Sequence, residues 1–429
     1  MNIIDRGKAF VQRLQEVATR SPKDWRVCPH CESTLTCKYG TYKRKVWFLF
    51  ERREMRIQRH KCNDCRRTYS EAPALLVRGS WYAREVHRYA IDHWVHIGSS
   101  FRRTAEWVRS ELGKQERWLM WRPLDESPSE EERCHLGATT VHRWVDRAGI
   151  AAQQRVEGQL EGIATSGQVG VDGLWARLGG GATRVVLLLQ DSVTGLVLPP
   201  VVAKGEAARQ CWRKMFQRAQ KAGFDLQGLR GVTSDGAHAL IGCLKEIAGW
   251  ANHQSCVWHL WRIIWREITK ITSMAALGFV GEAAKARGKE LQQELLILMH
   301  AVLDARGLRQ AEIALANLVA HPLGKDLARR VGKLLDEAFA HLSAYNQGLI
   351  RVAPEWCWRD FRLRLSRGRN HGSAERLERA ALLWAIYRNF TPAQERSERK
   401  RRYRWPGLSP LEVAGGRPGT VSYLDALGI

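Results

Sequence analysis

The chain has 429 residues, 45% of them hydrophobic, and a formal net charge of +24, which predicts two to four globular domains with affinity for a polyanion. It contains no run of about 18 apolar residues, and its N-terminus lacks the charged-then-apolar pattern of a signal peptide, so we expect neither a membrane span nor secretion. These features predict a cytoplasmic protein that is associated with the nucleoid through nucleic acid.

Two Cys-x-x-Cys pairs mark residues 1–75. Zn²⁺ takes four soft ligands in a tetrahedron, and each pair supplies two of them from one tight turn. Aromatic and β-branched residues mixed with arginine predict a β-hairpin over 39–57, between the pairs. We therefore predict a zinc ribbon that folds on Zn²⁺ and docks on DNA or protein, because four unrelated free cysteines would not repeat this spacing. The predicted ligands are Cys28, Cys31, Cys62 and Cys65.

A helix-turn-helix domain is predicted over residues 80–150. A first helix is expected over 84–94, and a second begins after a capping serine, Ser99 or Ser100. A polar stretch over 125–133 is predicted as a loop.

The last helix of this domain is expected over 137–149, where it ends at a glycine. Val141, Trp144 and Val145 would pack inward. The alternative is an ordinary amphipathic helix, since periodicity alone does not separate the two. As a DNA-recognition helix, the segment would present to base edges the side chains of Thr139, Thr140, His142 and Arg143.

Strand patterns fill the first part of the next domain, residues 165–265. Three strands, a helix, a strand that ends in an acid and a second helix follow one another, which is the element order of an RNase H-like fold. The expected strands cover 169–177, 184–190, 195–202 and 231–235, the helices cover 205–221 and 236–247, and residues 255–259 form the next strand edge.

Asp172, inside the first of these strands, and Asp235, at the end of the fourth, are the candidate metal ligands. A charged aspartate in an apolar strand costs several kcal/mol unless a partner compensates it. Two adjacent carboxylates repel each other, and a hard divalent cation such as Mg²⁺ relieves that repulsion. The alternative is that each aspartate only caps a turn.

A third acid is expected after a helical insertion over 266–368. The last segment, 369–429, begins with a helix that Ser373 would cap, which puts Glu375 in its first turn. Glu378, one turn later, is the rival candidate. The predicted fold class is thus a multidomain α/β protein with an RNase H-like mixed sheet and a helical insertion, preceded by a zinc ribbon and a helix-turn-helix.

In this order the motifs resemble bacterial insertion-sequence transposases related to the eukaryotic Mutator group, which use a DDE triad of carboxylates. The matching motifs are Asp172 in Val-Gly-Val-Asp-Gly, the pair Asp235-Gly236, the Cys-x-x-His of Cys256 and His259, Glu375-Arg-Leu-Glu-Arg379, and the C-terminal stretches 387–390 and 408–415. One departure is that Asn370 lies five residues before Glu375, where three is usual in the family, so Glu378 stays open as the third acid.

The resemblance implies a DNA transposase that acts on double-stranded DNA, both transposon ends and target. Asp172, Asp235 and Glu375 would hold Mg²⁺ or Mn²⁺ for strand cleavage and strand transfer. Paired ends imply a homodimer or higher oligomer. The resemblance places the Cys256–His259 pair close to DNA, and basic side chains such as Arg262 and Arg369 would contact the phosphate backbone. The alternatives are a catalytically silent DNA-binding regulator and a simple RNase H-like nuclease.

Overall fold

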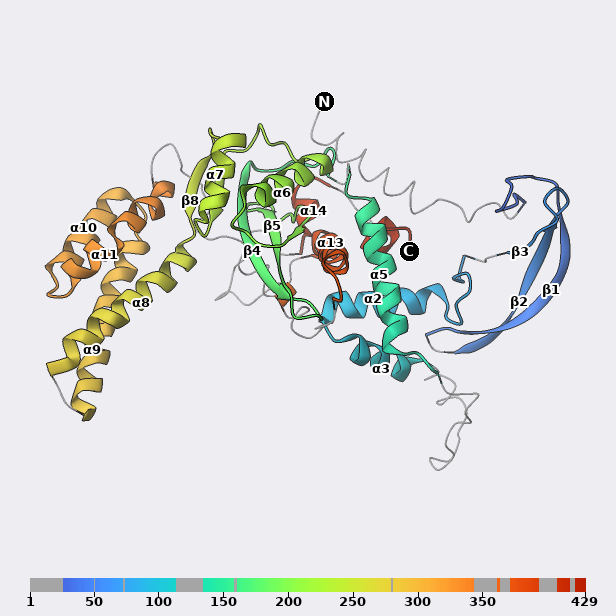
Figure 1. Cartoon of the computed structure of the whole chain (residues 1–429), viewed down its shortest axis with the longest axis horizontal. Coiled ribbons are helices and arrows are strands. Elements are labelled where there is room, and N and C mark those ends of the chain that lie inside the picture. Colours follow the sequence, from blue (N-terminus) through green and yellow to red (C-terminus); the bar gives the residue numbers. More distant parts are fainter. Residues whose placement is uncertain are drawn as a thin grey trace. The chain divides into compact units, whose positions relative to one another are not determined.

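The computed structural model of the chain, drawn in Figure 1, forms two compact units. The first unit comprises residues 1–162, 177–182 and 360–429, and the second comprises residues 163–176 and 183–359. None of the described helices is both long and apolar enough to cross a bilayer. The structure describes residues 26–49, 51–71, 74–112, 134–157, 160–278, 281–342, 361–362, 371–392, 407–416 and 421–429.

A three-stranded antiparallel sheet opens the first unit. Its strands β1 (Thr36–Trp47), β2 (Arg52–Cys62) and β3 (Thr68–Ser70) lie in chain order, and β1 and β2 form the hairpin predicted over 39–57. Most side chains of β1 and β2 are exposed, so this sheet has little core of its own. The buried apolar side chains at its base are Val46, Phe48, Ile57, Leu76 and Ala83.

In the described part of the first unit, helices follow the sheet. α3 (Phe101–Glu111) begins where the sequence predicts, because the Ser100 hydroxyl accepts a hydrogen bond from the Arg103 N–H. Trp94 of α2 stacks on Phe101 of α3 with 5.4 Å between ring centroids. The helices of this unit are α2 (Arg84–Ile97), α3, α5 (Ala138–Gln154), α13 (Ala374–Phe390), α14 (Pro410–Val413) and α15 (Tyr423–Ala426).

The prediction that Gly149 ends a helix is wrong, since α5 continues to Gln154. Gly149 lies where α13 crosses α5. A Cβ atom at this position would lie 2.7 Å from the Arg379 Cβ and 3.0 Å from the Arg379 carbonyl oxygen. The glycine therefore permits a close helix crossing and does not terminate the helix.

The second unit contains a five-stranded mixed sheet in the order β6-β5-β4-β7-β8. β7 runs parallel to both β4 and β8, whereas β5 and β6 are antiparallel. This arrangement confirms the mixed α/β class. The strands are β4 (Gln168–Arg177), β5 (Thr183–Asp191), β6 (Val201–Ala203), β7 (Gly231–Ser234) and β8 (Asn252–Ser255), and the helices connecting them are α6 (Arg209–Ala222) and α7 (His238–Ile247).

Two predicted elements of this sheet are shorter than expected. The third strand was predicted over 195–202, but β6 begins only at Val201, because Pro199 and Pro200 have no N–H to donate to a neighbouring strand. The helix predicted from residue 205 begins at Arg209. The intervening segment contains Glu206.

Helices follow β8 directly. The prediction of a strand edge over 255–259 is wrong beyond Ser255, since α8 already begins at Val257. The helical segment predicted to begin at residue 266 therefore begins earlier, at Val257. It consists of α8 (Val257–Ala275), α9 (Gly281–Leu303), α10 (Leu308–Ala320) and α11 (Gly324–Ala338), with short 3₁₀ turns over Ala276–Gly278 and Ala340–Leu342.

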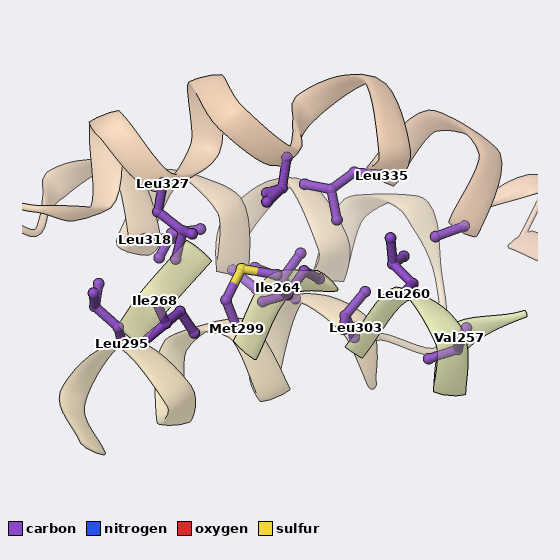
Figure 2. Packing of buried hydrophobic residues seen from close by; sticks show 14 of the residues in the cluster. Val257, Leu260, Ile264, Ile268, Leu295, Met299, Leu303, Leu318, Leu327 and Leu335 are labelled. Carbon is purple, nitrogen blue, oxygen red and sulfur yellow. The ribbon is translucent and has the colours of Figure 1, made fainter. Parts of the chain in front are cut away.

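These four helices share one apolar core. Figure 2 shows Leu260, Ile264 and Ile268 of α8 meeting Leu295 and Met299 of α9, among side chains that are at most a few per cent exposed. Leucines of α10 and α11 close the core from the other side. The spacing of four residues along α8 puts one face of that helix inward and leaves the opposite face to solvent.

Candidate functional site

The four predicted zinc ligands come together in the first unit. The Sγ atoms of Cys28 and Cys65 lie 3.6 Å apart, as do those of Cys31 and Cys62, and all four lie within 4.8 Å of one another. This donor set of four thiols is compatible with tetrahedral Zn²⁺. In the described part of the chain it is the one group of three or more ligating side chains this close together.

Each cysteine pair is held in a tight turn. The N–H of Cys28 donates to the Ser33 carbonyl at 2.8 Å, and the N–H of Cys62 donates to the Arg67 carbonyl at 3.0 Å. In both turns the residue after the second cysteine, Glu32 or Arg66, has a φ of 60°. The two turns thus repeat one strained backbone shape, and such strain persists where its surroundings enforce it. The pKa values of the two thiols of one close pair, Cys31 and Cys62, shift in opposite directions. Backbone hydrogen bonds, foremost from Cys65, lower the pKa of Cys62 to about 7. At Cys31 a backbone hydrogen bond from Ser33 is outweighed by burial and by contacts with the other cysteines, which raise the pKa of this thiol to about 12.

The two predicted aspartates lie at two neighbouring parallel strands of the second unit, Asp172 within β4 and Asp235 just past the end of β7. β4 pairs with β7 so that Gly170 lies opposite Thr233. Two positions further along each strand come Asp172, within β4, and Asp235, directly after β7. Adjacent strands are about 4.8 Å apart, so this register brings the two carboxylates to the same part of the sheet.

Local hydrogen bonds set the orientation of both carboxylates. Asp172 is 4% exposed, and its Oδ1 accepts from the Gly173 N–H at 2.8 Å. Asp235 is exposed, and its Oδ1 accepts from the Ala237 N–H at 3.1 Å. Between strand and helix Gly236 has a φ of 86°, which glycine adopts without strain. The turn therefore places Asp235 at the start of the connection between β7 and α7.

Another acid, Glu206, lies against β4 on the strand face opposite to the Asp172 side chain, and it was missed in the sequence. A Cβ atom on Gly173 would lie 2.5 Å from Glu206 Oε2, so this carboxylate rests against the backbone next to Asp172. Its Oε1 accepts from Trp175 Nε1 at 3.2 Å, and its backbone carbonyl accepts from the buried Trp212 at 2.8 Å. The only sequence signal was one acid in a basic segment between a strand and a helix.

The electrostatics link Glu206 to Asp235, and Asp172, Asp235 and Glu206 are together called the acidic spot. Burial raises the pKa of Glu206, the hydrogen bond from Trp175 opposes this, and the negative charge of Asp235 raises it further. Among the described residues only the four thiols form a group of three or more ligand atoms close enough to hold one ion, so these three carboxylates do not enclose a metal position by themselves. They offer oxygen donors only, which is the ligand set that Mg²⁺ and Mn²⁺ prefer.

Glu375 belongs to the first unit, in the first turn of α13. The predicted cap is present, since the Ser373 hydroxyl accepts from the Arg376 N–H at 3.2 Å. The Glu375 side chain is 64% exposed and pairs with Arg379, while Glu378 is half-buried. Arg379 also pairs with Asp146 of α5.

The predicted base-contacting side chains of α5 differ in exposure. Thr139 and Arg143 are exposed, whereas Thr140 and His142 are half-buried. His142 meets the edge of the Phe101 ring at 4.9 Å, and burial together with the positive charge of Arg376 lowers its pKa. As predicted, the side chains of Val141, Trp144 and Val145 are buried.

The Cys-x-x-His pair lies at the start of α8. Cys256 precedes the helix, is 1% exposed, and donates its N–H to the Ser234 carbonyl at 2.7 Å. This bond places the start of α8 next to Ser234, at the end of β7. Arg262, one turn further, is exposed and lies over the Trp258 ring. The predictions for the loop 125–133, Arg369 and Asn370 fall outside the described residues.

Comparison with protein-family models and with curated proteins gave no match to this chain.

Proposed function

We propose that the chain is a DDE-type DNA transposase. The observation that carries the proposal is that Asp172, within β4, and Asp235, directly after β7, each follow by two positions the paired residues Gly170 and Thr233 of two parallel strands. The element order of the sheet, with three strands and a helix before β7, supports an RNase H-like core. Because one fold can host many functions, the carboxylates are the main support for this function, and the fold is secondary support.

In this proposal Asp172 and Asp235 bind Mg²⁺ or Mn²⁺, with Glu375 as the third acid and Glu378 as the alternative. When bound, the metal would activate the attacking oxygen and stabilise the leaving oxygen in an in-line displacement at phosphorus. Asp172, buried in β4, has a fixed position, and the turn at Gly236 holds Asp235 next to it. Glu206 adds a negative charge that strengthens cation binding at this spot.

The reaction has two steps that balance without a redox partner. Water first attacks a phosphodiester at the end of the element, which leaves a 3′-hydroxyl on one side and a 5′-phosphate on the other. That hydroxyl then attacks a phosphodiester of target DNA, forms a new bond and releases a target 3′-hydroxyl. No covalent protein intermediate arises, so the chain needs no nucleophilic side chain at this site.

DNA is the proposed partner, with a homodimer or higher oligomer joining two ends. The net charge of +24 favours binding to the phosphate backbone. On α5, the exposed Thr139 and Arg143 are the side chains best placed for base contacts. The four-cysteine ribbon, with Zn²⁺ bound, would present further basic side chains to the same DNA.

The test is cleavage and joining of a supercoiled plasmid that carries this coding sequence with its flanking DNA, in Mg²⁺ and in Mn²⁺. Nicks at the element ends and joining to a second plasmid are measured for wild type, Asp235→Ala and Glu375→Ala. Asp225→Asn is the matched control, because Asp225 is also exposed and also accepts from the N–H two residues on.

Activity that Asp235→Ala and Glu375→Ala abolish, with end binding and the Asp225→Asn control intact, is the expected result. End binding without cleavage in either metal would overturn the enzyme and leave a DNA-binding regulator. Cleavage without joining would identify a simple nuclease instead.

A further inference from the structure

The outer face of α8 carries a stripe of aromatic and basic side chains. Trp258, Arg262 and Trp265 follow one another at helical spacing, and Arg266 flanks them. Trp258 is 38% exposed and Trp265 is 49% exposed. The inner face of the same helix, drawn in Figure 2, already supplies the core with Leu260, Ile264 and Ile268, so neither tryptophan belongs to that core.

The stripe has two distinct parts. The Arg262 guanidinium lies over the Trp258 ring, 5.2 Å from its centroid, which holds its donors in one orientation. The Trp265 ring makes no ring or cation contact among the described side chains and is a flat apolar surface exposed to solvent. A held guanidinium suits a phosphate, and a bare indole suits another planar ring.

The end of α8 that carries Trp258 lies near Asp235. The N–H of Cys256 donates to the Ser234 carbonyl, next to Asp235, and α8 begins at the following residue. At about 1.5 Å per residue, Trp265 lies roughly 12 Å along the helix from that start. The stripe therefore runs away from the acidic spot over a length that a few nucleotides span.

We propose that this stripe binds an unpaired segment of DNA, with a base stacked on Trp265 and the backbone held by Arg262 and Arg266. The inference rests on the proposed function for its ligand class. Unpaired DNA is favoured over duplex because a duplex hides the faces of its bases, whereas tryptophan recognises bases by stacking on them. Two arginines beside two tryptophans match an anion with planar rings better than they match an apolar protein surface.

Binding of a fluorescein-labelled single strand, and of the duplex of the same sequence, is measured by anisotropy for the full chain. Trp265→Ala should weaken single-strand binding on the order of tenfold and leave duplex binding within about twofold. Trp265→Phe, which keeps a stacking ring, should restore most of the single-strand affinity. Trp250→Ala is the matched control, since Trp250 is 50% exposed in the same unit but lies outside α8.

The outcomes separate the two proposals. Equal effects of Trp265→Ala and Trp250→Ala, with DNA binding retained, would overturn the stacking role alone. A wild-type chain that binds neither form of DNA would overturn the proposed function as well. A change in sedimentation coefficient caused by Trp265→Ala, without a change in single-strand affinity, would show that the face joins copies of the chain.

Discussion

Glu206 lies against β4 on the face opposite to the Asp172 side chain and interacts electrostatically with Asp235. It rests on the Gly173 backbone beside Asp172, and the charge of Asp235 acts on it. Trp175 and Trp212 fix its side chain and its carbonyl from two directions. A carboxylate held this firmly in a partly buried place is typical of a group that positions a cation or its ligands.

Glu206→Gln removes the charge and keeps the shape, so we expect cleavage to fall on the order of 10- to 100-fold while end binding is retained. Raising the Mg²⁺ concentration should recover part of the loss, because the variant weakens cation binding. Glu312→Gln, at an exposed position of α10, is the control. Cleavage at the wild-type rate in Glu206→Gln would remove Glu206 from the site.

His87 makes the first unit sensitive to acid. Its ring is 5% exposed, stacks on Trp144 at 3.8 Å between centroids, and shares a 2.8 Å hydrogen bond with the Ser80 hydroxyl. Burial lowers its pKa to about 3, and the charges of Arg147 and Arg84 add to this. The unfolded chain, with a pKa of about 6.5, binds more protons between these values.

Stability that depends on neutral His87 is therefore complete above about pH 6.5 and is lost as the pH falls toward 3. Between pH 7 and pH 5 the loss amounts to about 2 kcal/mol. His87→Gln should reduce the pH dependence of the unfolding temperature in calorimetry, while His135→Gln, at an exposed position, should not. An unchanged pH dependence in His87→Gln would contradict the assignment.

At the scale of elements, the close crossing of α5 and α13 depends on a glycine, which has no side chain, at position 149. Gly149 lies against the Arg379 backbone, and the same arginine pairs with Asp146 of α5 and Glu375 of α13. Packing thus overrides the ordinary preference of a helix for alanine over glycine. The crossing also fixes the helix that carries Glu375, which makes its geometry relevant to the proposed chemistry.

We expect Gly149→Ala to lower the free energy of unfolding by about 1–3 kcal/mol, because the added Cβ would overlap backbone that cannot move independently. Gly332→Ala is the matched control. Gly332 lies within α11, where a Cβ would meet nothing within 4 Å. This control should raise stability by up to about 1 kcal/mol, and equal signs for the two variants in calorimetry would refute the close crossing.

At the scale of the whole molecule, the four-cysteine ribbon of the first unit and the helical core of the second unit have different sources of stability. The helical core of the second unit is assembled from buried aliphatic side chains. Near the four cysteines of the first unit, the buried cluster contains only Cys28, Cys62 and Tyr69, with Cys65 packed beside it. We therefore expect a core this small to depend on bound metal for its folding.

Chelation under reducing conditions should therefore unfold β1–β3 and leave the second unit folded. Hydrogen–deuterium exchange should become fast in β1–β3 and stay slow in β4, β5 and α8. Cys62→Ser should reproduce this without a chelator, whereas Cys37→Ser, next to the cluster but outside it, should retain zinc. Retained protection of β1–β3 after complete zinc loss would contradict the prediction.

Features that depend on neighbours in sequence were predictable. The two Cys-x-x-Cys turns, the caps at Ser100 and Ser373, and the buried face of α5 rest on short-range patterns, because a turn or a helix face is determined within a few residues. The acids Asp172 and Asp235 were identified as candidates because each stands out in its own strand. Whether they form a catalytic site with Glu375 is still a prediction.

Tertiary structure determined the contacts between residues that lie far apart in the sequence. Glu206 could be recognised only once α6 and β4 brought it to Gly173, and Gly149 proved to serve a helix crossing rather than a helix end. Likewise, the apolar run after Ser255 is compatible with a strand or a helix. In the structure Cys256 still hydrogen-bonds to Ser234, and the helix α8 begins at the next residue. By itself, the sequence thus determined the local turns, caps and amphipathic faces, whereas long-range packing selected which groups meet, because contact energies depend on spatial neighbours that no local pattern records.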